Sequence, residues 1–133
     1  MGKKLLIPII GVVIVVIGAA VYFFALRGEP PIVYTYISPG DFFVTNVKDA
    51  NRLLKVAVVI VVDTEDKEIL AEMEKHKPLI RDTIIFILRN ADEETLRDTS
   101  AHPPLREMIR NELNEVLGSE HVVNVLFNDY VIQ

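Results

Sequence analysis

LLIPIIGVVIVVIGAAVYFFAL, residues 5–26, is the stretch that decides how this chain is organised. Its 22 residues include no charged side chain, and 15 of them are Val, Ile, Leu or Phe. An α-helix of this length measures about 33 Å, which is enough to cross a bilayer core of about 30 Å. The stretch therefore predicts a single membrane-spanning helix.

Basic residues on either side of this helix predict its orientation. Lys3 and Lys4 precede the helix, whereas Arg27 follows it close to Glu29. Because basic residues near the ends of a span favour the cytoplasmic side, we expect the amino terminus inside and the remainder of the chain outside the cytoplasm. The aromatic residues 22–24 would then lie at the outer interface, where such rings concentrate.

A cleaved signal peptide is the alternative interpretation of the same stretch. Its apolar core would span about 7 to 15 residues and end at a site of small residues. This run is longer and ends in bulky aromatic residues, which favours an uncleaved anchor. The small residues Ala19, Ala20 and Ala25 are compatible with the alternative.

Small residues recur along the predicted helix. Gly11, Gly18 and Ala25 are seven positions apart, so they lie on one stripe along which another membrane helix could approach closely. Small residues are also common in membrane helices that pack in no such way. The run contains no Asp, Glu, Lys, Arg or His, so this helix cannot by itself relay protons.

The composition divides the chain into three segments. Residues 1–27 form the cytoplasmic tip and membrane helix, residues 28–32 form a short linker that contains Pro30 and Pro31, and residues 33–133 form one small domain. From Pro30 to Gln133 there are 11 basic and 18 acidic residues, a net charge of −7. An acidic domain is a poor partner for nucleic acid, and the absence of cysteine excludes disulfides and thiolate metal sites.

Alternation and β-branched composition predict four strands in this domain. Residues 33–37 and 42–47 are expected to form two short strands separated by a turn, and residues 53–62 a central strand buried on both faces. Residues 122–132 are expected to form the last strand, with a bulge or turn at Asn128 and Asp129.

Apolar spacing of about 3.6 residues predicts the helices. One helix is expected after the capping residues Asp63 and Thr64, with a kink or break at Pro78 and a continuation through Ile87. Residues 90–99 suit a loop or short helix. Another helix is expected from Pro103 to Gly118, with an apolar face made of Leu105, Met108, Ile109, Leu113, Val116 and Leu117. Strands and helices in this order predict an α+β domain, a sheet packed with helices.

Residues that could carry chemistry are scattered. Ser119 and His121 are the closest hydroxyl and imidazole, but no nucleophile motif surrounds them. Glu72 and His76 lie one helical turn apart, yet a zinc site needs further ligands that the sequence does not nominate. The acidic residues Asp92, Glu93, Glu94 and Asp98 lack the spacing of a calcium loop. We therefore expect no enzyme activity, no metal, no cofactor and no small-molecule substrate.

A series of positions forms an ordered pattern after the predicted membrane helix: Phe43, Thr45, Asn46, Pro78, Arg81, Asp82, Leu105, Arg106, Asn114 and Gln133. In this order they resemble the FliL family of flagellar basal body-associated proteins. We expect these positions to be structural.

The resemblance implies a single-pass protein of the inner membrane with a periplasmic domain similar to stomatin and prohibitin domains. It also implies association with the flagellar stator proteins MotA and MotB, support of torque and motility, and self-association into a ring. A membrane-tethered, stomatin-like scaffold unrelated to motility is the alternative. An exported hydrolase that uses Ser119 or His121 is a third.

Overall fold

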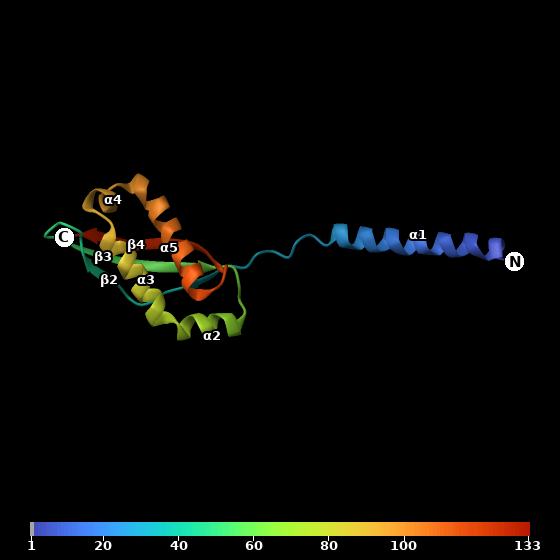
Figure 1. Ribbon diagram of the computed structural model, residues 1–133, viewed down its shortest axis with the longest axis horizontal. Helices are drawn as coiled ribbons and strands as arrows, with labels where there is room; N and C mark the ends of the chain where they lie inside the picture. The colour runs from blue at the N-terminus through green and yellow to red at the C-terminus, as the bar shows by residue number, and fades with distance from the viewer. Residues whose placement is uncertain (1) are drawn as a thin grey trace. The chain divides into compact units, whose positions relative to one another are not determined.

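The computed structural model describes residues 2–133, and the chain divides into the two compact units Met1–Pro31 and Ile32–Gln133 (Figure 1). The first unit contains α1 (Gly2–Leu26), a helix exposed along its whole length with a mean hydropathy of 2.9 over its most apolar window. Among the described residues it is the one helix long and apolar enough to span a membrane. The predicted helix is confirmed, and Met1 lies outside the described residues.

The second unit, called the head below, is built on an antiparallel sheet. Its strands are β1 (Thr35–Ile37), β2 (Phe43–Asn46), β3 (Leu53–Val62) and β4 (Val122–Ile132). All three others pair with β3: β4 runs along one edge, and β1 and β2 lie end to end along the opposite edge. The segment 38–42 interrupts this second edge.

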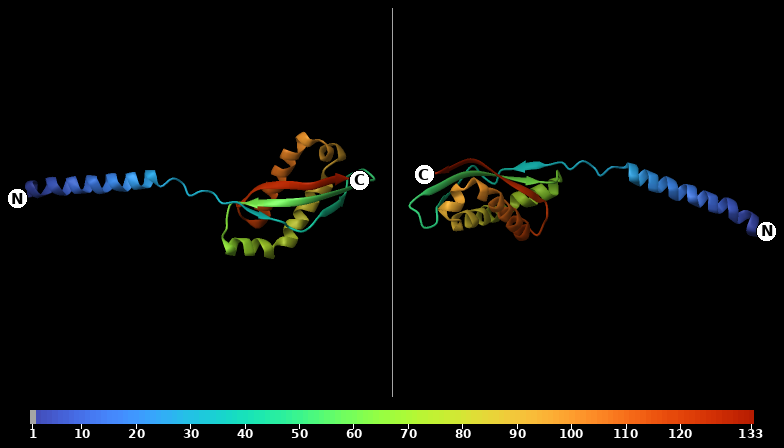
Figure 2. Two further views of the ribbon diagram at one scale, coloured as in Figure 1. Left: turned by 180° about the vertical axis from the view of Figure 1, so that it is seen from behind. Right: turned by 90° about the horizontal axis from the view of Figure 1, so that it is seen from above.

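Helices cover one face of the sheet, as the view from above in Figure 2 shows. They are α2 (Lys67–Lys75), α3 (Lys77–Asn90), α4 (Glu93–Arg97), the short 3₁₀ helix η1 (Thr99–Ala101) and α5 (His102–Leu117). α5 packs on β4, and α3 packs against α5 and β2. The predicted α+β class is confirmed.

One apolar core lies between the helices and the sheet. Alternate residues of β3 point into it, because successive side chains of a strand face opposite sides. Its fully buried members are Phe43, Leu54, Val56, Val58, Ile60, Val62, Ile84, Leu88, Leu96, Ile109, Leu113, Val122 and Val125. Since all of these residues belong to the head, its core is complete without α1.

Two expectations about the strands were wrong in part. The first strand begins at Thr35 rather than residue 33, because Thr35 already pairs with Val62, the last residue of β3. The central strand is not buried on both faces along its length: Leu53 and Lys55 are exposed, and buried residues follow one another only from Ile60 to Val62. The reason is that the helices cover a single face. The bulge is confirmed by a shift of register near Asn128 and a φ of 48° at Asp129.

The helices also depart from expectation at their ends. α2 is capped by Asp66, whose carboxylate accepts the Glu68 N–H, and not by Asp63 or Thr64. Asp63 instead continues the sheet by donating its N–H to the His121 carbonyl. The predicted break is confirmed at His76, which separates α2 from α3, and Pro78 lies in the first turn of α3.

Residues 90–99 contain the short helix α4, and α5 begins at His102, one residue before Pro103. α5 ends at Leu117 and is capped by Gly118, whose φ of 61° is left-handed.

Candidate interaction site

Arg81 on α3 fastens the segment between β1 and β2. Its Nη1 donates a hydrogen bond to the Pro39 carbonyl at 2.9 Å, and its Nη2 donates to the Phe42 carbonyl at 3.3 Å. The guanidinium also lies over the Phe43 ring, 4.3 Å from its centroid. Gly40 passes so close that a Cβ there would overlap Arg81, and its φ of 139° favours glycine. Arg81 thus holds the interruption of the sheet edge against α3.

Asn114 on α5 ties this helix to the start of β4. Its Nδ2 donates to the Val122 carbonyl at 2.8 Å, and its Oδ1 accepts the Val122 N–H at 3.0 Å. The side chain therefore pairs with Val122 as a neighbouring strand would. The Asn114 carbonyl accepts the Ser119 N–H, which closes the turn after Gly118.

Gln133 and Asn46 lie at the far end of the sheet. The backbone of Gln133 exchanges two hydrogen bonds with Leu53, at 2.7 and 2.8 Å, and Asn46 pairs with Leu53 from the other side. These three residues line an open cavity of about 590 Å³ together with Ala50, Asn51 and Arg52.

The other signature positions are separate from one another. Thr45 is buried beside Leu54, Leu105 is buried in the core, and Asp82 is exposed on α3. The Nε of Arg106 is buried without a hydrogen-bond partner. The signature residues therefore form contacts between elements at several places and do not converge on one pocket.

The predicted packing stripe lies on α1. Gly11, Gly18 and Ala25 are exposed there, and a Cβ at either glycine would meet no described atom within 4 Å. Beyond Ala25, the Arg27 guanidinium lies over the Phe23 ring at 4.6 Å. The stripe remains a prediction about an additional helix.

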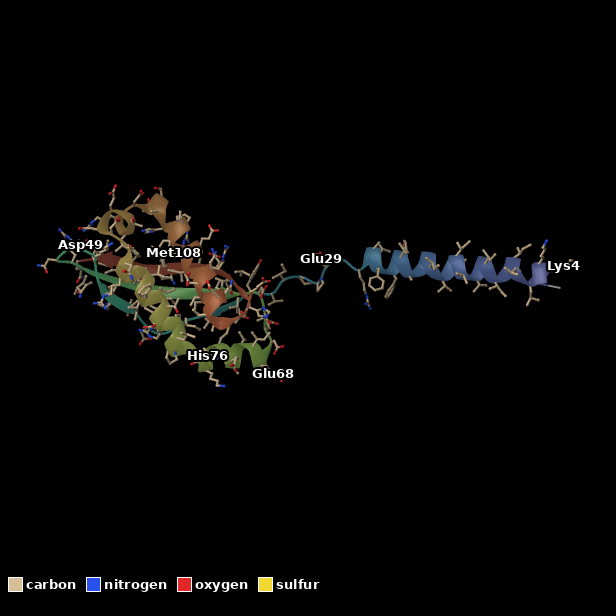
Figure 3. The ribbon with its side chains drawn as sticks, viewed as in Figure 1. Lys4, Glu29, Asp49, Glu68, His76 and Met108 are labelled. Carbon is tan, nitrogen blue, oxygen red and sulfur yellow. The ribbon has the colours of Figure 1, made fainter. Side chains whose placement is uncertain are left out.

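The hydroxyl and imidazole candidates meet in one cavity of about 280 Å³ that Glu72, His76, Ser119 and His121 help to line. The Ser119 Oγ accepts the backbone N–H of His121, and His121 Nδ1 lies 2.8 Å from Asp63 Oδ1. His76, labelled between α2 and α3 in Figure 3, is hydrogen-bonded to Glu72 at 2.9 Å. Within residues 2–133 no hydrogen bond joins a serine hydroxyl to an imidazole, the contact that an activated nucleophile needs.

The acidic residues near α4 have structural partners. Asp92 caps α4, and the pKa of its carboxyl lies below the usual value because the backbone N–H and side chain of Thr95 bond to it. The pKa of Asp98 is likewise lowered by the Ser100 hydroxyl and N–H. Glu93 pairs with Arg52 at 3.1 Å and with Arg97 at 2.9 Å. Among the described residues, no three His, Asp or Glu side chains are placed to hold a metal ion.

Tyr130 and His102 join α4, α5 and β4. The Tyr130 hydroxyl donates to the Leu96 carbonyl at 2.6 Å, and His102 Nε2 is hydrogen-bonded to the same oxygen at 2.9 Å. The two rings are 4.7 Å apart, with Phe127 beside both. Burial raises the pKa of Tyr130 to about 12, so the hydroxyl remains a donor at physiological pH.

The sheet face away from the helices is free in the head. We call it the open sheet face, and define it by the residues whose register places them opposite the core side: Tyr36, Val44, Asn46, Leu53, Lys55, Ala57, Val59, Val61, Asn124, Leu126, Asn128 and Val131. Tyr36 is 65% exposed and Val44 is 56% exposed. The Lys55 ammonium lies over the neighbouring Phe42 ring at 4.3 Å.

A second free apolar surface lies between α3 and α5. This α3–α5 groove has a volume of about 430 Å³ and is lined by Thr83, Phe86, Ile87, Asn90, Ala91, Asp92, Thr95, Leu105, Met108 and Glu112. Phe86 is 69% exposed and Met108 is 55% exposed. Exposed apolar patches of this kind mark interaction sites in soluble domains.

The prediction that Met108 and Val116 lie on the buried face of their helix was wrong. They are exposed because the side chains of this helix that enter the core are Leu105, Ile109 and Leu113, with Leu117 packed partly against it. Phe86 was not singled out from the sequence. Its exposure could have been inferred from the sequence, because this large aromatic residue lies off the apolar stripe formed by Ile80, Ile84 and Ile87.

Comparison with known proteins identifies the family. A family model for the flagellar basal body-associated protein FliL matches residues 36–133, nearly the whole head. A flagellar protein FliL from Aquifex aeolicus (strain VF5) is 27% identical over 109 residues, which cover 82% of this chain and 68% of that protein. The resemblance predicted from the sequence is confirmed, and this chain belongs to the FliL family of flagellar basal body-associated proteins.

Proposed function

We propose that this protein is a membrane-anchored scaffold that binds the flagellar stator proteins MotA and MotB and supports torque generation in swimming and swarming. Membership of the FliL family carries the proposal, because it assigns the chain an accessory role at the flagellar motor. The anchor supplies location, and the head supplies contacts to proteins held in the same bilayer. Confinement to one membrane raises the effective concentration of such partners, so modest contacts suffice.

We also propose the arrangement of the chain in the cell. α1 crosses the inner membrane with its amino terminus in the cytoplasm, and the head lies in the periplasm. Lys3 and Lys4 before the helix support this orientation. Several heads associate into a ring, and their fold is similar to that of stomatin and prohibitin domains. The layer of helices on one face of an antiparallel sheet supports this comparison.

Complementation of a strain that lacks the gene tests the function. The full chain should restore the swimming halo, whereas a chain without residues 1–27 should not, because the head is then no longer held beside the stator. An unrelated membrane helix of the same orientation, placed before residue 28, serves as the control for anchoring alone. Full motility without any anchor would contradict the proposed role.

Labelling with a membrane-impermeant maleimide tests the orientation, because the natural chain contains no cysteine. Lys75→Cys, on the exposed surface of α2, should be labelled in intact spheroplasts, and Lys4→Cys should be labelled only after lysis. The reverse pattern would place the head in the cytoplasm.

Crosslinking in intact cells distinguishes a motor scaffold from a stomatin-like scaffold unrelated to motility. A photoreactive residue in place of Phe86 or Tyr36 should recover the stator proteins or other copies of this chain. Recovery of proteins unrelated to the motor, without stator proteins or other copies of this chain, would support the stomatin-like scaffold unrelated to motility.

A further inference from the structure

We propose that heads of this protein associate head to tail, with the open sheet face of one copy docked on the α3–α5 groove of the next. The inference rests on the self-association in the proposed function and adds which two surfaces meet. It also identifies the occupant of both surfaces as a second copy of this chain.

The open sheet face differs in charge from the rest of the head. Of the 12 side chains that the strand register places on it, Lys55 is the one that carries a charge. No carboxylate is among them, although the segment from Pro30 to Gln133 has 18 acidic and 11 basic residues. Apolar side chains and asparagines make up nearly all the remainder, so the side chains that the register assigns to this face carry a single positive charge, and Asp129 lies in the bulge, which the register assigns to neither face.

The α3–α5 groove has the opposite character. Its lining includes the carboxylates of Asp92 and Glu112 and no basic side chain. Phe86 and Met108 rise from the two helices that border it, and Met108 is labelled on α5 in Figure 3. The groove therefore offers exposed apolar side chains with a negative rim.

Charge complementarity favours contact between the two unlike surfaces. Docking of one open sheet face on another would bring two Lys55 ammonium groups together, and docking of groove on groove would gather four carboxylates. Docking of sheet face on groove places Lys55 near Asp92 and Glu112, while Val44 and Leu53 cover Phe86 and Met108. Electrostatic complementarity of this kind selects partners and fixes orientation.

Geometry makes the contact heterologous. Figure 2 shows that the helices cover one face of the sheet, and two of them border the groove, so we infer that the groove and the open sheet face point away from each other within one head. One copy cannot satisfy its own two surfaces. Each copy therefore binds one neighbour through its open sheet face and another neighbour through its α3–α5 groove. Repetition of this contact adds copies one after another until the last copy meets the first in a closed ring.

Mixed disulfide crosslinking of the full chain in membranes tests this contact. The chain has no cysteine, so Val44→Cys and Met108→Cys each introduce a single thiol. With different tags on the two variants, oxidation should give a mixed dimer when both are expressed together and little dimer when either is expressed alone. Lys75→Cys on α2, paired with each variant, is the matched exposed control.

A charge exchange provides a second measurement in the same membranes. Lys55→Glu or Glu112→Lys should each lower the yield of mixed dimer about fivefold, and the two changes together should restore it when placed in the copies that face each other. Failure of restoration, with both single variants correctly inserted, would contradict the assigned pairing.

Other outcomes would overturn the inference. Strong crosslinking of Val44→Cys with itself would show a symmetric contact between sheet faces, and no crosslink above the Lys75→Cys control would show that the two surfaces do not meet. Either result would leave the motor role intact if complementation still depends on the chain. Conversely, the crosslink between sheet face and groove could form while loss of the protein leaves motility unchanged. That result would contradict the proposed function and would leave the head-to-tail contact standing.

Discussion

Leu53 and Leu54 are neighbours of the same residue type, yet they lie on opposite faces of β3. Leu54 is fully buried among the helices, whereas Leu53 is 45% exposed on the open sheet face. The contrast is strongest at this end of the strand, where Leu53 and Lys55 are exposed, and it fades toward Val61, which is buried although it lies on the open sheet face. Residues on the covered face stabilise the fold, and residues on the open face remain available for association.

Truncation of the two leucines should give the largest difference. Leu54→Ala is expected to lower the free energy of unfolding of the head by about 2 to 5 kcal/mol, because it leaves a cavity in a packed core. Leu53→Ala should cost less than about 1 kcal/mol. Urea denaturation of residues 32–133, which contain the whole core, measures both. Equal losses would show that the open face also contributes to the core.

Asn114→Ala should have the next largest effect. It removes both partners of the buried Val122 backbone, so the expected loss is about 2 to 4 kcal/mol. Hydrogen exchange should show faster exchange of the Val122 amide in particular. Asn111→Ala, on an exposed position of the same helix, is the control. A loss no greater than that of the control would mean that water replaces the Asn114 contacts.

Arg81→Ala should loosen the segment between β1 and β2. Two hydrogen bonds and the stacking on Phe43 are lost, for an expected cost of about 1 to 2 kcal/mol because the guanidinium is partly exposed. Limited proteolysis should then cut near residues 38–42 faster than in the natural protein. Asp82→Ala, next to Arg81 and exposed, should change neither measurement. An unchanged proteolysis rate in Arg81→Ala would show that the segment 38–42 keeps its conformation without the Arg81 contacts.

The caps of α4 and η1 should have the smallest effect, and that effect should depend on pH. The pKa values of Asp92 and Asp98 lie below the usual value of 3.8 in the folded head. Their stabilisation is therefore complete above that value and is lost as the pH falls through the lowered pKa values. The melting temperatures of the head and its D92A/D98A variant should differ at pH 7 and converge as the pH falls below the usual carboxyl pKa. A constant difference would exclude the charge as the cause.

Local sequence patterns predicted much of the fold. The bounds of β3 agree with the apolar run from Leu53 to Val62, and the break at His76 follows from Pro78. These features depend on residues close together in the chain. The membrane helix was predictable for the same reason, since its length and composition suffice.

Features that depend on distant residues were not predictable. Arg81 and Pro39 are 42 positions apart, and no local pattern indicates that they meet. The apolar run of β3 was also compatible with burial on both faces, because periodicity does not reveal how many layers the helices form. Exposure of Phe86 and Met108 depends in the same way on how closely α3 and α5 pack.

Val44→Glu tests most directly whether the covered face folds the head and the open face associates. Val44 lies on the open sheet face and is 56% exposed, so the free energy of unfolding should change by less than about 1 kcal/mol. Head-to-tail crosslinking between Leu53→Cys and Met108→Cys copies should fall about tenfold, because a carboxylate then faces the acidic groove. Unchanged crosslinking, or unfolding of the head, would contradict this division between the two faces.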